Sequence, residues 1–190
     1  MLLTINCEFL SQWNPQYDHV ENDQKRYDEI LVAVESELAR SGTLSEQTFL
    51  RIIEWKAARV KGKLSTGYGE YAIAIKAAHQ ANGIDSKVRI LVQLDGIGVP
   101  VASTILHFMF PNEIPINDRR TVEILHAAGL VKHSSRDEQR FLPFVAAILQ
   151  IRLQCPQFTL REIDRALFAY HKLEFEPRRT GKPPRLKCNI

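Results

Sequence analysis

The sequence predicts an all-α protein, with one helical domain over residues 1–175. Apolar residues recur at helical spacing in nearly every segment. No pair of segments alternates apolar and polar residues as antiparallel strands do. The connecting segments are short, and no repeat or glycine-rich linker divides the chain. With 190 residues, nearly half of them apolar, the chain can bury a proper core.

Four helices are predicted in the first half of the chain. Each carries an apolar stripe and is bounded by a glycine or by a side chain that caps helices. The segments are 22–42 ending at Gly42, 43–62 opening on the capping-box pair Thr43 and Glu46, 69–83 ending at Gly83, and 85–94 opening on Asp85 or Ser86.

Four more helices are predicted in the second half, and residues 176–190 are predicted to form a basic, flexible tail with little to bury. These helices show the same boundary signals. They are 99–110 after Gly98, 118–129 between Asp118 and Gly129, 139–154 after the pair Ser135 and Glu138, and 159–175 opening on Thr159 and Glu162.

Cysteine usage and hydropathy exclude several protein classes. Cys7, Cys155 and Cys188 are far apart and show no metal-ligand spacing, so reduced thiols in a cytoplasmic protein are expected, with no zinc or iron–sulfur site. The N-terminus lacks the basic start of a signal peptide, and no apolar run reaches membrane-spanning length, so no membrane partner is expected.

Charge is unevenly distributed along the chain, although the net charge is only +3. Residues 1–50 contain nine acids and three bases, whereas residues 51–65 contain five bases and one acid. A basic region of this kind indicates contact with a polyanion, and a solvated surface is the competing interpretation.

The stretch Leu91–Leu125 carries the most specific pattern. Gly96 and Gly98 alternate with Ile97 between two predicted helices, and the free N–H groups at the start of the second helix are suited to bind a phosphate. Further on, Asp118 opens a helix and is a preferred N-cap residue. The positive end of the helix dipole favours the ionised form of a carboxylate at this position.

Residues 94–125, with "LDGIG" and "PINDRRTVEIL", resemble the helix-hairpin-helix DNA glycosylase superfamily, which includes endonuclease III and adenine glycosylase. The resemblance implies two helical lobes beside a cleft. Lobe A spans about 44–116 with the hairpin at 86–110, and lobe B spans about 1–43 plus 117–175. It also implies binding of double-stranded DNA and places Asp118 on the catalytic aspartate.

The same resemblance implies the ligands of the hairpin. The N–H groups of Gly98, Val99 and Val101, together with the bare backbone at Gly96, would hold a phosphate. The carbonyls of Val92, Leu94 and Ile97 would bind a monovalent cation.

Two positions depart from the family pattern. Pro100 stands where bifunctional members carry a lysine, so Schiff-base lyase chemistry is not expected and any base excision would be monofunctional. Asp95 stands where the family has proline, which adds a negative charge beside the phosphate site. The iron–sulfur cysteines of endonuclease III are also missing, so no such cluster is expected.

Basic side chains near these motifs are candidate DNA contacts. Arg119 and Arg120 adjoin Asp118, and pairing with an acid of this chain is the alternative for both. A second group is Lys56, Arg59, Lys61 and Lys63, with surface charge as its alternative.

Three functions follow from these patterns. The first is a monofunctional DNA N-glycosylase that uses Asp118. The second is a non-catalytic DNA- or protein-binding module in which Asp118 is only a cap. The third is an enzyme that acts on a small nucleotide or another ligand in the same cleft. Trp55, Tyr68 and Tyr71 could line a base pocket or lie in the core, and His107 is expected to be a packed histidine.

Overall fold

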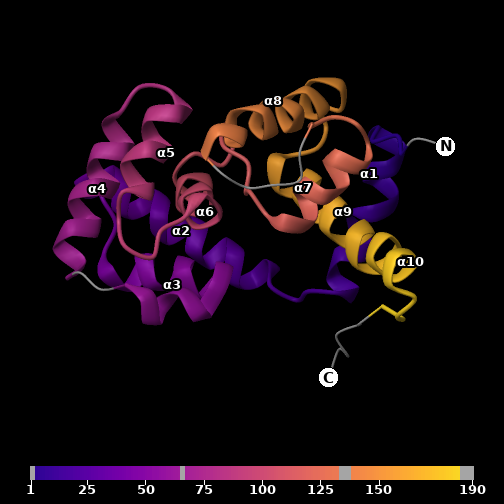
Figure 1. The fold of residues 1–190 in the computed structure, drawn as a ribbon. Coiled ribbons are helices and arrows are strands. Elements are labelled where there is room, and N and C mark those ends of the chain that lie inside the picture. Colours follow the sequence, from indigo (N-terminus) through magenta and orange to yellow (C-terminus); the bar gives the residue numbers. More distant parts are fainter. Residues whose placement is uncertain (1–2, 65–66, 133–137, 185–190) are drawn as a thin grey trace. The chain divides into compact units, whose positions relative to one another are not determined.

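The protein is all-α, as the sequence predicts. The computed structural model describes residues 3–64, 67–132 and 138–184, and within these ranges it contains helices and turns but no strand (Figure 1). None of the helices in these ranges is long and apolar enough to cross a membrane. The chain divides into two units, each of which is described by itself. Unit 1 comprises Met1–Asp23 and Asn117–Ile190, and unit 2 is the continuous segment Gln24–Ile116.

Unit 2 is organised around α6, whose residues are all buried except Pro100. This helix is apolar on every side and packs against α2, α3 and α5, as a helix enclosed by others must. The elements of unit 2 are α2 Gln24–Ser41, α3 Glu46–Ala57, the 3₁₀ helix η2 Ala58–Lys63, α4 Tyr68–Gln80, α5 Ile84–Val92 and α6 Val99–Met109.

Helix α2 belongs to unit 2, whereas the sequence places residues 24–43 in the lobe of Asp118. Its buried stripe of Tyr27, Ile30 and Val34 packs against α3 and α6. The resemblance that implies the lobes covers only residues 94–125, and periodicity identifies the apolar face of a helix but not the partner that covers it.

Unit 1 is organised around α9, which packs against α1, α7 and α8 (Figure 1). Seven of its residues are buried, and the Thr159–Glu162 capping box opens it as predicted. The elements of unit 1 are α1 Cys7–Trp13, the 3₁₀ helix η1 Pro15–His19, α7 Arg119–Ala127, α8 Glu138–Gln154, α9 Leu160–Tyr170, the π-helical turn η3 His171–Phe175 and α10 Glu176–Thr180.

Two parts of unit 1 differ from the sequence prediction. Helix α1 was not predicted, since it is short and its apolar residues are interrupted. Asn6 caps it, and Phe9 and Trp13 each lie 5.1 Å from Tyr170 of α9, measured between ring centroids. Residues 176–180, predicted as part of the flexible tail, form α10, because η3 continues the helical path beyond α9.

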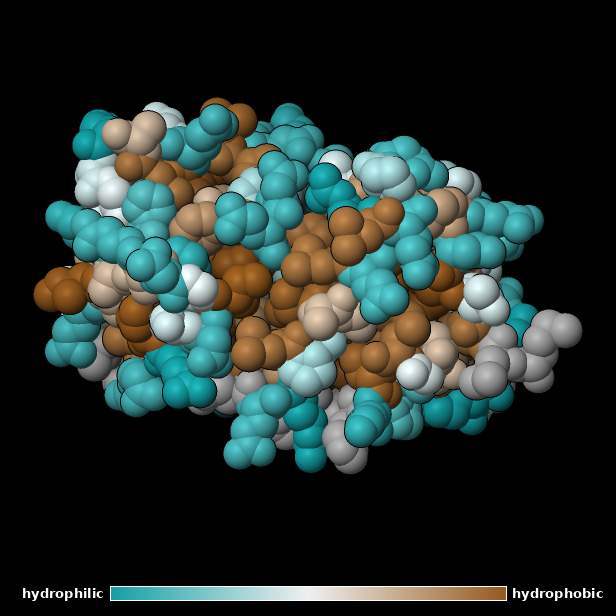
Figure 2. Space-filling view, turned by 90° about the horizontal axis from the view of Figure 1, so that it is seen from above, coloured by the Kyte–Doolittle hydropathy of each residue, from teal (hydrophilic) through white to brown (hydrophobic). Residues whose placement is uncertain are grey.

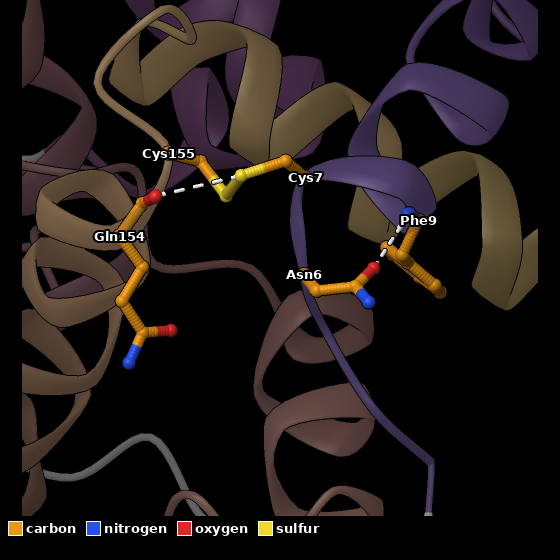
Figure 3. Close-up of a disulfide and its surroundings, with 5 residues drawn as sticks. All are labelled: Asn6, Cys7, Phe9, Gln154 and Cys155. Atoms are coloured by element: carbon orange, nitrogen blue, oxygen red, sulfur yellow. Dashed lines mark hydrogen bonds between the residues drawn. A yellow bond between two sulfur atoms is a disulfide. The ribbon is translucent and has the colours of Figure 1, made fainter.

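The structure contradicts the prediction that all cysteines are reduced. Cys7 and Cys155 form a disulfide with a Cα–Cα distance of 5.4 Å (Figure 3). The packing of α1 against α9 brings Cys7 to the end of α8, and the sulfur of Cys7 lies 3.5 Å from the carbonyl oxygen of Gln154. Cys188 lies outside the described residues. Pairing over such a sequence separation is a tertiary effect that spacing alone cannot reveal.

Two predicted helix starts are also corrected. Ser45, not Thr43, caps α3, because Glu37 binds the N–H and hydroxyl of Ser45 while Thr43 donates to the Ala72 carbonyl. Helix α5 begins directly after Gly83 without a side-chain cap, so Asp85 and Ser86 lie within its first turn. The side chains of Ser135 and Glu138 lie outside the described part.

Candidate functional site

The turn between α5 and α6 requires glycine at one position. Gly96 has a φ of +78°, and a Cβ placed there would lie 2.9 Å from the carbonyl oxygen of Lys63. Tyr71 donates a hydrogen bond of 3.0 Å to the carbonyl oxygen of Asp95. Two neighbouring segments therefore fix the path of the turn, and the absence of a side chain at Gly96 allows the close approach.

Gly98 has a different environment, because it is exposed and forms the N-cap of α6. Its φ of −88° suits any residue, and a Cβ there would meet only Pro100 Cδ, at 3.8 Å. The carbonyl oxygen of Gly98 accepts the N–H groups of Val101 and Ala102, both at 2.9 Å. Of the predicted phosphate donors, Val101 thus already has an acceptor, and Gly98 and Val99 are the donors at the front of the helix.

The predicted cation ligands are backbone carbonyls at and just beyond the end of α5. The Leu94 carbonyl accepts the Ile97 N–H at 3.1 Å, which uses one of its two lone pairs. Carbonyl oxygens suit a hard cation, so Val92, Leu94 and Ile97 fit a monovalent ion in their donor chemistry. Among the described residues, no group of three or more His, Cys, Asp or Glu side chains could hold a metal.

The basic segment after α3 lies next to the hairpin turn. The carbonyl oxygen of Lys63 and the side chain of Leu64 lie 2.9 and 3.3 Å from the position that a Cβ on Gly96 would occupy. Arg59, Lys61 and Lys63 are exposed and Lys56 is half-buried. Lys61 pairs with Glu54 at 2.8 Å, and this hydrogen bond holds the pKa of the Glu54 carboxyl below its ordinary value. The structure therefore brings the basic segment and the hairpin together, although part of the positive charge is compensated.

Asp118 is the N-cap of α7. Its Oδ1 accepts the backbone N–H of Arg120 at 2.9 Å and lies 3.7 Å from a terminal nitrogen of the Arg120 guanidinium. The side chain is 21% exposed, so it remains in contact with solvent. Arg119 is more exposed and lies 3.7 Å from Glu123 in the next turn. The same position of the Asp118 side chain thus caps the helix and places a carboxylate at the positive end of α7.

Asp118 belongs to unit 1 and the hairpin to unit 2. The structure therefore brings Asp118 together with Arg119 and Arg120, and Gly96 and Gly98 together with the basic segment. The predicted cleft between the two lobes stays a prediction.

A buried polar network, which the sequence analysis does not predict, lies next to α7. Arg161 donates to Asp164 at 2.8 Å, to the Tyr17 hydroxyl at 3.0 Å and to Asp23 at 3.1 Å, and Thr121 of α7 donates to Asp164 at 3.0 Å. Burial raises the pKa of the Tyr17 hydroxyl far above its ordinary value. Arg161 and Asp164 lie three residues apart on α9, which is the one signal of this network in the sequence.

His171 forms a second polar contact under α7. Its Nε2 lies 2.8 Å from Glu123, and its Nδ1 has no hydrogen-bond partner within the described part of the chain. Burial lowers the pKa of His171 below its ordinary value of 6.5, against the opposing effects of Glu123 and Glu176. The neutral imidazole is therefore favoured, with Nε2–H donating to the carboxylate.

The aromatic candidates separate into two environments. Trp55 is half-buried and packs against the core residues Tyr27 and Phe108, with ring centroids at 5.9 and 5.4 Å. Tyr68 and Tyr71 line a pocket of about 250 Å³, and burial raises the pKa of Tyr68 to about 12.

His107 is a packed histidine, as predicted. It is almost fully buried, and its Nδ1 lies 2.8 Å from the Ile114 carbonyl, which can only accept. The opposite nitrogen, Nε2, lies 2.8 Å from the Tyr27 hydroxyl. In the neutral ring, Nδ1–H therefore donates to Ile114 and Nε2 accepts from Tyr27.

Comparisons with known proteins add no relative to this picture: no protein-family model, no curated protein and no solved structure matches the chain.

Proposed function

We propose that this protein binds double-stranded DNA and excises a base by a monofunctional mechanism, in which Asp118 stabilises the positive charge on the sugar. The observation that carries the proposal is the start of α7, where the Asp118 carboxylate is solvent-accessible and lies beside the Arg120 guanidinium. It lies within the ungapped resemblance to helix-hairpin-helix glycosylases over residues 94–125.

The chemistry of base excision explains why this carboxylate suits the reaction. Cleavage of the glycosidic bond builds positive charge on the sugar ring, and a fixed anion lowers the free energy of that state. The N–H of Arg120 and the positive end of α7 favour the ionised form of Asp118. Pro100, two residues after Gly98, has no side-chain amine that could form a Schiff base. Release of the base would therefore leave an abasic site in an uncleaved strand.

The unit-2 surface supports the DNA-binding part of the proposal. The exposed N-cap Gly98 opens α6, and the exposed Arg59, Lys61 and Lys63 lie on the segment that contacts the hairpin turn. A backbone phosphate at the start of α6 would have the N–H groups of Gly98 and Val99 as donors. Each phosphate neutralised by one of these basic side chains should add about −0.9 to the slope of log affinity against log salt.

Binding to a duplex with a cationic abasic-site analogue tests the catalytic role. The wild-type protein should prefer this duplex over undamaged DNA by about 100-fold or more, as expected of a transition-state mimic. Asp118→Asn should lose the preference but keep its affinity for undamaged DNA. Asparagine caps helices as well as aspartate does, so the unfolding free energy of this variant should change by less than about 0.5 kcal/mol.

Two further variants separate the carboxylate from the cap. Asp118→Ala removes both and should cost about 1 kcal/mol of unfolding free energy in addition. Asp18→Asn changes the same charge at an exposed site of unit 1 and should leave the preference intact. A wild-type preference that survives in Asp118→Asn would show that the carboxylate does not face a cationic sugar.

A second candidate function is a non-catalytic binding module. The hydrogen bond from the Arg120 N–H to Asp118 favours it, because capping alone accounts for an aspartate at this position. In that case the protein should bind the cationic analogue and undamaged duplex equally, or bind neither.

A further inference from the structure

We propose that a cavity in unit 1, lined by Arg120, Lys172 and Lys182, is a phosphate-binding site. The cavity measures about 350 Å³ and is formed by the start of α7, by η3, by α10 and by the residues that follow α10. The described residues that line it all belong to unit 1, whereas the hairpin belongs to unit 2.

The basic side chains that line the cavity favour an anionic ligand. Three bases face one acid, Glu176, so the cavity has a net positive charge. The Thr180 hydroxyl donates to the Glu176 carbonyl at 2.7 Å, which leaves the oxygen of the hydroxyl as an acceptor. The cationic nitrogens of Arg120 and Lys182 are donors that bind phosphate through charge-assisted hydrogen bonds.

Arg120 is held in an orientation that suits a phosphate. Its guanidinium carbon lies 4.9 Å from the centroid of the Phe168 ring, which supports the planar group on one face. Its nearest carboxylate oxygen, on Asp118, is 3.7 Å away and too distant for a hydrogen bond. Its Nε is buried without an acceptor among the described residues. The chain itself therefore leaves this guanidinium incompletely hydrogen-bonded, and because the side chain is 25% exposed, a phosphate can bind its solvent-accessible part.

Two sources could supply the phosphate, namely a DNA strand or a free phosphate or nucleotide. The cavity is large enough for more than a single phosphate group, and Arg120 follows Asp118 by two residues. A strand phosphate held here would anchor the DNA next to the carboxylate. Only the assignment to a DNA strand rests on the function proposed above, because the phosphate site itself depends on the cavity alone.

The first arm of the test uses inorganic phosphate and no DNA. Phosphate is titrated into the full chain at constant ionic strength, and ¹H–¹⁵N spectra follow the Arg120 Nε–H and the amide of Lys182. Both signals should shift in a saturable way, and Arg120→Gln and Lys182→Gln should each weaken the affinity about tenfold or more. Arg178→Gln is the matched control, because Arg178 lies on α10 but does not line the cavity.

The second arm uses duplex DNA and the same variants. If the site holds a strand phosphate, Arg120→Gln should weaken duplex binding and reduce the salt slope by about 0.9, whereas Arg178→Gln should not. Phosphate binding without this change would support the site and assign it to a free phosphate or nucleotide.

The two proposals fail separately in this design. The phosphate site would be overturned if the shifts were absent, did not saturate, or were the same in Arg120→Gln and Lys182→Gln as in the wild type. This holds even if duplex binding through the hairpin were intact. Saturable phosphate binding in a protein that binds no duplex would support the site and remove the proposed function.

Discussion

Replacing Gly96 by alanine should destabilise the protein, whereas the same change at Gly98 should not. At Gly96 the backbone has a φ of +78°, where a residue with a Cβ is disfavoured by about 1–2 kcal/mol. The new Cβ would also lie 2.9 Å from the Lys63 carbonyl oxygen, and this backbone atom can move only if η2 shifts. The lower entropy of the unfolded alanine variant offsets about 0.4–1 kcal/mol. A net loss of about 1–3 kcal/mol of unfolding free energy follows.

The expected result at Gly98 has the opposite sign. Its φ of −88° suits alanine, and the nearest atom to a new Cβ is Pro100 Cδ at 3.8 Å, an ordinary van der Waals contact. Only the effect on the unfolded chain remains, so the unfolding free energy should stay constant or rise by up to about 1 kcal/mol. Gly62→Ala is the matched control, because a Cβ there would meet no atom within 4 Å.

Urea denaturation of the wild type and the three variants measures these differences, with the midpoints compared at a common m-value. The same proteins then enter a duplex-binding assay. Gly98→Ala places a methyl group at the exposed start of α6, so its duplex affinity should fall about tenfold without loss of stability. Equal stability of Gly96→Ala and Gly98→Ala would refute the argument that the turn requires glycine at position 96.

The remaining predictions concern unit 1. Reduction of the Cys7–Cys155 disulfide should lower the unfolding free energy by about 2–5 kcal/mol, because the bond closes a loop with a sequence separation of 148. Urea midpoints that do not change when a reductant is added would contradict this. Burial lowers the pKa of His171 in the folded state, so the unfolded chain binds a proton at this residue more readily than the folded chain does. The unfolding free energy should therefore fall as the pH drops below about 6.5. His171→Gln should flatten that dependence in unfolding experiments between about pH 7.5 and 5. Asp164→Ala should cost about 1.5–3 kcal/mol, because the buried Arg161 guanidinium loses its 2.8 Å partner and keeps Asp23 at 3.1 Å. A loss below about 1 kcal/mol in thermal unfolding would contradict this.

Local sequence signals predict the helices well where a single side chain sets the boundary. Thr159 and Glu162 form the capping box of α9, and Asp118 caps α7, both as expected. The cap of α3 was misassigned, because Glu37 reaches Ser45 from the preceding helix. A contact between two helices has no local signature, so spacing rules favour the wrong residue in such cases.

The candidate site was predictable in its residues but not in its surroundings. The glycines and Asp118 belong to a contiguous pattern, and their local geometry follows from turn and cap chemistry. The contact of Lys63 with Gly96 and the support of Arg120 by Phe168 both join segments that are distant in sequence. Tertiary packing creates these contacts, and the sequence pattern carries no record of them.

The assembly of unit 1 from two separated segments has a consequence for folding during synthesis. Unit 2 is continuous, so its residues 24–116 can pair as soon as they emerge from the ribosome. Helix α1 packs on α9, which begins at Leu160, and must wait for roughly 150 further residues. At about 5–20 residues per second, that delay is roughly 8–30 s. During this interval Phe9 and Leu10, which are buried in the folded protein, lack their final partners, so their apolar surface stays exposed until α9 has been synthesised.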